Sequence, residues 1–154
     1  MKQALRRLAP LLFIAVLVAT GCEAPETELT PDAELQRELG LSPDDRVHTV
    51  SISTGVSERA EPDSIVVSPG DYLQFVSDDW LVHEVRFQVD DLETAAGRFL
   101  ESTGQLASPP LLQLGARFLL AFEDAPMGRY PYILQGNRES GTGLIVVASP
   151  PGLP

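Results

Sequence analysis

Residues 128–147, which read GRYPYILQGNRESGTGLIVV, constrain the fold more than any other part of the chain. Tyr130, Tyr132 and Leu134 alternate with their neighbours at the period of two that a half-buried strand requires. Gly136-Asn137 interrupts this alternation, and glycines at 141 and 143 precede the apolar run at 144–147. The stretch therefore predicts a strand, a short loop and a returning strand.

Shorter patterns of the same kind come earlier in the chain. We expect strands at 47–54, 65–67, 72–77, 81–89 and 117–122, with a turn at Pro69-Gly70-Asp71. Seven or eight short strands separated by turn signals are typical of an all-β, Greek-key β-sandwich. An immunoglobulin-like sandwich is the alternative, although its usual Cys…Trp…Cys core is missing from this sequence.

One segment, near residues 91–103, has the period of a helix instead. We expect Asp90 or Asp91 to cap its N-terminus and Gly104 to end it. The predicted buried stripe consists of Leu92, Ala95, Ala96, Phe99 and Leu100. The sandwich should therefore carry one helical excursion.

Three motifs in this order point to a known family. They are Pro-Gly-Asp at 69–71, Asp-Asp-x-x-x-His at 78–83 and Gly-x-Tyr-x-Tyr at 128–132. Over residues 47–148 the chain resembles the cupredoxins, the plastocyanin and azurin family. The resemblance implies a cupredoxin-like sandwich and a copper site at one end of it.

The copper ligands of that family are mostly replaced here. A type 1 centre needs two imidazoles, a thiolate and a weak axial ligand such as Met. The resemblance places Leu134 at the position of the cysteine and Asn137 at that of the second histidine, so that only His83 matches. We therefore expect a degenerate copper site and no cofactor.

His83 has two interpretations that the sequence leaves open. It is a weak candidate for a sulfur-free Cu(II) or Zn(II) site with Asp78, Asp79 or Glu84, together with His48. Otherwise it is a structural histidine whose ring is held by a backbone carbonyl, the commoner situation for a lone histidine.

The same end of the fold is where the resemblance implies partner docking. In cupredoxins an apolar patch surrounds the exposed copper-ligating histidine. The matching positions make Trp80, Leu81, His83 and Pro110 the partner-binding candidates. The alternative for Trp80 is that it packs into the core.

The first residues resemble a bacterial lipoprotein signal. Residues 1–21 contain Lys2, Arg6 and Arg7, then a short apolar run, and they end in Thr-Gly before Cys22. The resemblance implies cleavage and acylation at Cys22, with an ordinary signal peptide as the alternative. Residues 22–46 then form an acidic, Pro-rich linker, residues 47–148 the domain and residues 149–154 a Pro-rich tail.

The charge, the cysteine content and the absence of catalytic motifs argue against several classes of function. After residue 21, eight arginines face 22 acids, a formal charge of −14, which argues against nucleic acid as a partner. Cys22 is the only cysteine, so no disulfide can form within the chain. The sequence contains no recognisable nucleophile–base pair or paired-carboxylate site, so we do not expect an enzyme.

Together these features predict a membrane-anchored, extracytoplasmic lipoprotein of a bacterial cell envelope, periplasmic or on the cell surface. Its cupredoxin-like module would bind an extracytoplasmic protein or have a structural role. The alternative is a copper-binding protein of sulfur-free ligation that handles copper or transfers electrons.

Overall fold

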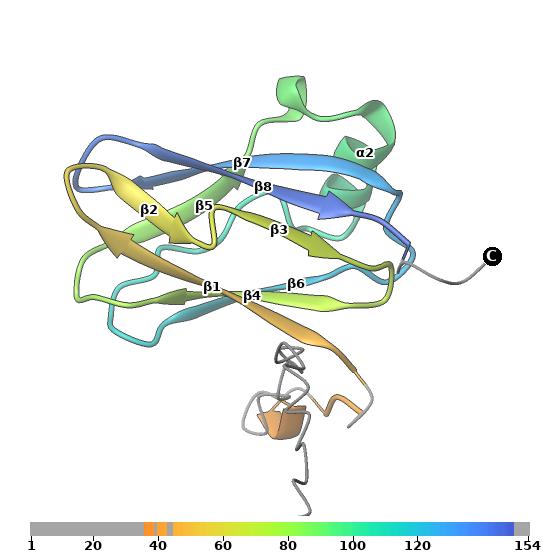
Figure 1. The fold of residues 1–154 in the computed structure, drawn as a ribbon, viewed down its shortest axis with the longest axis horizontal. Helices are drawn as coiled ribbons and strands as arrows, with labels where there is room; N and C mark the ends of the chain where they lie inside the picture. The colour runs from red at the N-terminus through yellow and green to blue at the C-terminus, as the bar shows by residue number, and fades with distance from the viewer. Residues whose placement is uncertain (1–35, 39, 43–44, 150–154) are drawn as a thin grey trace, which may run out of the picture.

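The computed structural model describes residues 36–38, 40–42 and 45–149, which contain a sandwich of two four-stranded sheets (Figure 1). The first sheet has the order β2 (Glu58–Glu61), β1 (Val47–Thr54), β4 (Tyr72–Ser77) and β6 (Arg117–Ala121). The second has the order β3 (Ser64–Val67), β8 (Gly141–Val147), β7 (Gly128–Gly136) and β5 (His83–Phe87). The all-β prediction and the strand number are confirmed.

Both sheets are mixed. β1 pairs with β4 in parallel and β3 pairs with β8 in parallel, whereas the other neighbours are antiparallel. β5 pairs with β7 so that His83 lies opposite Gly136 and Val85 opposite Leu134. Because side chains alternate along a strand, His83 and Val85 share the inner face of this sheet with Leu134.

The core lies between the sheets and is rich in aromatic rings. Alternation in β1 buries Val50 and Ile52 and leaves Ser51 and Ser53 half-buried. The Tyr132 ring meets the edge of Phe75 at a centroid distance of 5.0 Å, a favourable T-shaped contact. Tyr130 makes a similar contact with Phe122 at 5.8 Å. The tyrosines of the predicted hairpin are therefore core residues.

The helical excursion is shorter than predicted. It consists of a 3-10 helix, η1 (Val89–Asp91), and an α-helix, α2 (Thr94–Ser102). Its N-cap is Glu93 rather than Asp90 or Asp91, and Ala95 is exposed while Gly97 is buried. The buried face of the helix therefore differs from the predicted stripe, because the α-helix begins only at Thr94. Gly104 has φ +70°, as a residue following the helix end requires.

Two strand predictions were wrong in a way that matters for the site. The predicted strand at 81–89 is β5, which begins only at His83, so Leu81 and Val82 belong to the preceding loop. β2 was not predicted, because its sequence Glu-Arg-Ala-Glu carries three charges. It nevertheless buries Glu58 and Ala60 on one face.

The N-terminal features lie almost entirely beyond the described residues. Residues 1–35, including Cys22, are outside them, as are Leu39 and the prolines from 150 onward. Within the linker at 22–46, residues 36–38 are helical and Gly40 has φ +65°. Within the described part of the chain, no helix has the length and apolar character needed to cross a membrane.

Candidate functional site around His83

The candidate site lies at the end of the sandwich where four connections meet. They are the β1–β2 turn, the β4–β5 loop, the segment that precedes β6, and the β7–β8 loop, all at the left in Figure 1. β1 enters and β8 leaves at the opposite end. We call the first of these the loop end of the domain.

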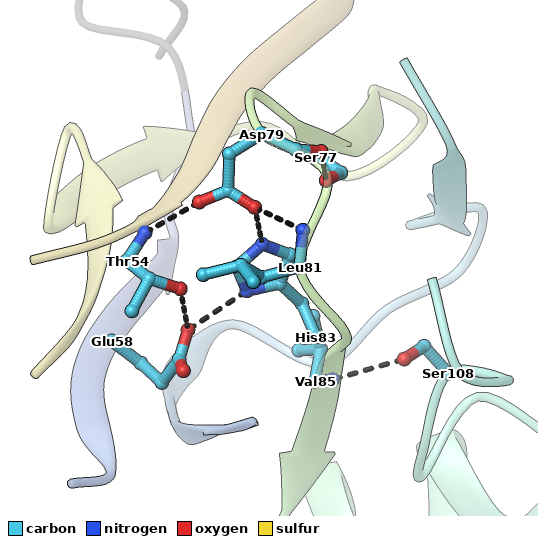
Figure 2. Close-up of polar contacts among 8 residues, drawn as sticks. All are labelled: Thr54, Glu58, Ser77, Asp79, Leu81, His83, Val85 and Ser108. Carbon is cyan, nitrogen blue, oxygen red and sulfur yellow. Dashed lines mark hydrogen bonds and ion pairs between the residues drawn. The ribbon is translucent and has the colours of Figure 1, made fainter. Parts of the chain in front are cut away.

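His83 is fully buried at the start of β5 and both of its ring nitrogens face carboxylates (Figure 2). Nδ1 lies 2.8 Å from Oε2 of Glu58, and Nε2 lies 2.8 Å from Oδ1 of Asp79. The expectation that a backbone carbonyl holds this ring was therefore wrong. Of the carboxylates predicted near it, only Asp79 contacts the ring.

Glu58 is the site residue that the sequence failed to reveal. Its side chain is fully buried, and its Oε2 accepts a hydrogen bond from the Thr54 hydroxyl at 3.2 Å as well as facing His83. Its Oε1 has no hydrogen-bond partner among the described residues. A buried carboxylate is unfavourable unless it is paired, so the His83 ring is its main compensation.

The glycines of the β7–β8 hairpin make room for Glu58. A Cβ atom at Gly136 would collide with the Glu58 carboxylate and the Val82 carbonyl, and one at Gly141 would collide with the Glu58 backbone. Neither glycine has a φ in the left-handed region, so close approach explains them better than an unusual conformation. The glycines at 136 and 141 were therefore a sequence signal for a close approach at this site. The sequence alone does not show that the approaching residue is Glu58.

Asp79 ties the β4–β5 loop to the first sheet. Oδ2 accepts the Thr54 amide at 2.8 Å, and Oδ1 accepts the Leu81 amide at 2.7 Å in addition to His83 (Figure 2). Burial would raise the pKa of Asp79, but the amides of Leu81 and Thr54 and the His83 ring outweigh it and hold the pKa below its ordinary value. Asp79 is therefore a charged anchor for the loop.

The residues at this end do not fit a type 1 copper ion. Leu134 is fully buried in the core, and Asn137 is exposed in the β7–β8 loop. Neither supplies sulfur or imidazole, and both nitrogens of His83 already face carboxylates. Among the described residues, no three His, Cys, Asp or Glu side chains are placed to hold a metal ion.

The other predicted metal partners lie elsewhere. His48 pairs with Asp71 at 2.8 Å, and it stands six residues before Thr54 on β1, or about 20 Å away along the strand. Asp78 is exposed, and Glu84 lies 3.4 Å from Arg86. His48 and His83 therefore cannot share a site in this fold.

Two neighbouring segments of the loop end carry exposed apolar side chains. The β4–β5 loop runs beside the segment before β6, because Leu111 pairs with His83 and the Gly115 amide donates to the Ser77 carbonyl. Trp80 is 74% exposed, which excludes its packing in the core, and Leu112 is 65% exposed. We define the apolar end surface as Trp80, Leu81, Val82, Leu112 and Leu114.

The remaining docking candidates differ in position. Pro110 is exposed on the segment that leads to Leu112. His83 lies beneath the surface and is fully buried, so it can influence a partner only through the loop above it.

Comparisons with known proteins return cupredoxins among solved structures. A copper-containing nitrite reductase from Thermus scotoductus SA-01 has a TM-score of 0.49 and 21% identity over 67% of this chain, which spans 22% of that protein. A purple cupredoxin from Nitrosopumilus maritimus has a TM-score of 0.44 and 21% identity, over 66% of this chain and 99% of the other. An oxidized amicyanin variant has a TM-score of 0.45 and 21% identity, over 66% of this chain and 82% of the other.

Neither the scan against protein-family models nor the search of curated proteins finds a match. The fold stands on the two sheets, their strand order and the helical excursion between β5 and β6. The described domain is a β-sandwich of two mixed, four-stranded sheets with one helical excursion.

Proposed function

We propose that this chain is a non-catalytic, lipid-anchored docking module of a bacterial cell envelope, whose apolar end surface binds a protein partner. The observation that carries the proposal is that five exposed apolar side chains, Trp80 among them, lie on two neighbouring segments at one end of the domain. Aromatic residues at the centre of an exposed apolar patch are characteristic of binding hot spots.

The charge of the domain favours a particular kind of partner. Residues 47–148 contain 14 acids and six arginines, a formal charge of −8, and Asp78 lies exposed beside the apolar end surface. Such a domain is repelled by anionic lipid and attracted to basic surfaces. We therefore propose a protein partner whose docking face has an apolar centre and Lys or Arg at its rim.

The direction of the chain agrees with this role. β1 enters the sandwich at the end opposite the apolar end surface (Figure 1). A tether from an acylated Cys22 would reach the domain there and would leave the loop end free to meet a partner. Lipidation rests on the sequence resemblance, and replacing Cys22 with Ser should move the protein from the membrane fraction to the soluble fraction.

Photocrosslinking in cells tests the docking proposal. A photoreactive phenylalanine analogue at position 80 or 112 should give the same discrete crosslinked species, and its yield should fall with salt because the rim is charged. Met127 is the matched control, because it is 63% exposed but precedes β7, far from the loop end. Equal crosslinking at 127, or none at 80 and 112, would refute the proposal.

Copper handling through sulfur-free ligation rests on the fold alone and is the second candidate. Metal analysis of protein purified without chelator, followed by calorimetric titration with Cu(II), distinguishes the two. We expect no binding tighter than millimolar, because both His83 nitrogens face carboxylates. Micromolar binding that is lost in His83→Gln would favour copper handling.

A further inference from the structure

We propose that the free edge of β3 is a second docking site, where an extended, basic segment of another protein adds a strand to the second sheet. β3 is the outermost strand of that sheet, and among the described strands it pairs with β8 alone (Figure 1). The site lies along the side of the sandwich, so it does not depend on the docking proposed for the apolar end surface.

The hydrogen bonds of β3 show which of its backbone groups are free. The carbonyls of Asp63 and Val67 each accept an amide from β8 or from the residue that follows it. Because the direction of the backbone groups alternates along a strand, Ser64 and Val66 point their N–H and C=O groups away from β8. Among the described residues, no backbone group is bonded to these outward groups. We call them the β3 edge.

The other outer strands are protected on their free sides. Along β5, the segment 106–111 supplies backbone hydrogen bonds. At β6, the Gln105 side chain bonds both the N–H and the C=O of Ala121. At β2, the Glu58 amide donates to the Glu139 carbonyl, and three of the four residues are charged. β3, with the sequence Ser-Ile-Val-Val, has neither a charge nor a proline, and unprotected strands of this kind recruit other chains.

The side chains at the β3 edge suit a strand partner. Val66 is 61% exposed, and Ser64 is exposed as well. The register places them beside Val146 and Leu144, which are half-buried on the outer face of the sheet. An antiparallel partner would exchange two hydrogen bonds with each outward residue, four in all. Its residue opposite Val66 should be apolar and β-branched, because it extends this apolar row.

The charge around the β3 edge selects a basic segment. Glu61 and Asp63 are exposed just before β3, and residues 60–70 contain no Lys, Arg or His. Both acids also line a polar groove of about 780 Å³, together with Asp78, several serines and a threonine, and Arg59 is the one base in its lining. A Lys or Arg opposite Asp63 therefore meets opposite charge, whereas an acidic segment is repelled.

The same charge argues against a second copy of this chain as the occupant. Each domain has a formal charge of −8 over residues 47–148. Two β3 edges that paired with each other would bring together two acidic domains, with no base in residues 60–70 of either copy to compensate. The edge therefore suits the basic segment of a different protein.

Titration of the full-length chain in detergent with a synthetic peptide tests this proposal. The probe is acetyl-Thr-Val-Thr-Val-Lys-Lys-amide, whose valines would lie opposite Val66 and Ser64 and whose first lysine would lie opposite Asp63. ¹H–¹⁵N correlation spectra and hydrogen exchange report each backbone amide. We expect saturable shifts at the Ser64 and Val66 amides and exchange slower by at least about tenfold. The amides of Ile65 and Val67, which face β8, should change least.

Matched controls separate strand pairing from charge attraction. The same peptide N-methylated at both valines keeps its charge but lacks the two N–H groups that donate to the edge, so it should bind at least about tenfold more weakly. Glutamates in place of both lysines should abolish binding. In the protein, Val66→Pro removes one outward N–H, a change that an outer strand tolerates, and should weaken binding. Val66→Thr keeps that N–H and should preserve binding.

Equal binding of the N-methylated peptide, or no saturable change at the Ser64 and Val66 amides, would overturn the proposal. Concentration-dependent shifts at these two amides without peptide, together with a dimer in sedimentation, would also overturn it, because they would assign the edge to a second copy. All of these measurements use the unmodified chain, so they decide the question even where Val66→Pro fails to fold. Crosslinking from position 80 tests the apolar end surface separately, and neither result affects the other.

Discussion

Removing the His83 ring should destabilise the domain strongly, because it strands a buried charge. His83→Leu leaves the fully buried Glu58 carboxylate with only the Thr54 hydroxyl at 3.2 Å. Breaking a buried ion pair by removing one partner typically costs about 3–5 kcal/mol. For a domain of this size that corresponds to a fall in Tm of at least about 12 °C.

The complementary variants make a double-mutant cycle. Glu58→Leu leaves the ring paired with Asp79 and one buried nitrogen without its partner, a cost of about 1–3 kcal/mol. The double variant removes both charges and fills the space with hydrocarbon, while Asp79 keeps its two amide donors. Its loss should therefore be smaller than the sum of the single losses by at least about 2 kcal/mol.

Urea unfolding followed by far-UV circular dichroism measures these differences as changes in midpoint at constant slope. Tryptophan emission is unsuitable as the only probe, because Trp80 is 74% exposed and reports the loop rather than the core. A loss below about 1 kcal/mol in His83→Leu, or additive losses in the double variant, would show that the two side chains do not form a buried charge pair.

Three further predictions follow from the same contacts. Gly136→Ala should lower stability by about 1–3 kcal/mol in urea unfolding, since its Cβ would displace the Glu58 carboxylate; an unchanged midpoint would contradict that packing. Burial, and then the charge of Glu93, raise the pKa of Tyr130 to about 12, so the folded state keeps the phenol proton after the unfolded chain has lost it near pH 10. Stability should therefore fall between about pH 10 and 12, and Tyr130→Phe should reduce that fall in urea midpoints taken at each pH. The pKa of Asp79 lies below the ordinary 3.8, so its stabilisation is present above that pH and is lost as the pH falls through the folded value. Asp79→Asn should flatten the acid side of the stability profile, and a profile of unchanged slope would refute this assignment.

Much of the fold was predictable because strand periodicity is local. The alternation of Val50 and Ile52 with serines predicted the bounds of β1, and Pro69-Gly70-Asp71 placed the turn before β4. The same reasoning missed β2, where a buried glutamate occupies a position that apolar residues usually fill. Strand propensity depends on neighbouring residues only, so it cannot account for the burial of Glu58 against His83, which lies 25 residues away in the sequence.

The sequence by itself determined that the chain is rich in strands, and that Leu134 and Asn137 occupy the positions that the resemblance assigns to the thiolate and the second imidazole of a type 1 copper site. Only the tertiary structure decided that His83 is held between Glu58 and Asp79, and that Trp80 faces outward. Those outcomes depend on which sheet each strand joins and in what register. Such long-range pairing is fixed by the packing of the whole domain and leaves no periodic trace along the chain.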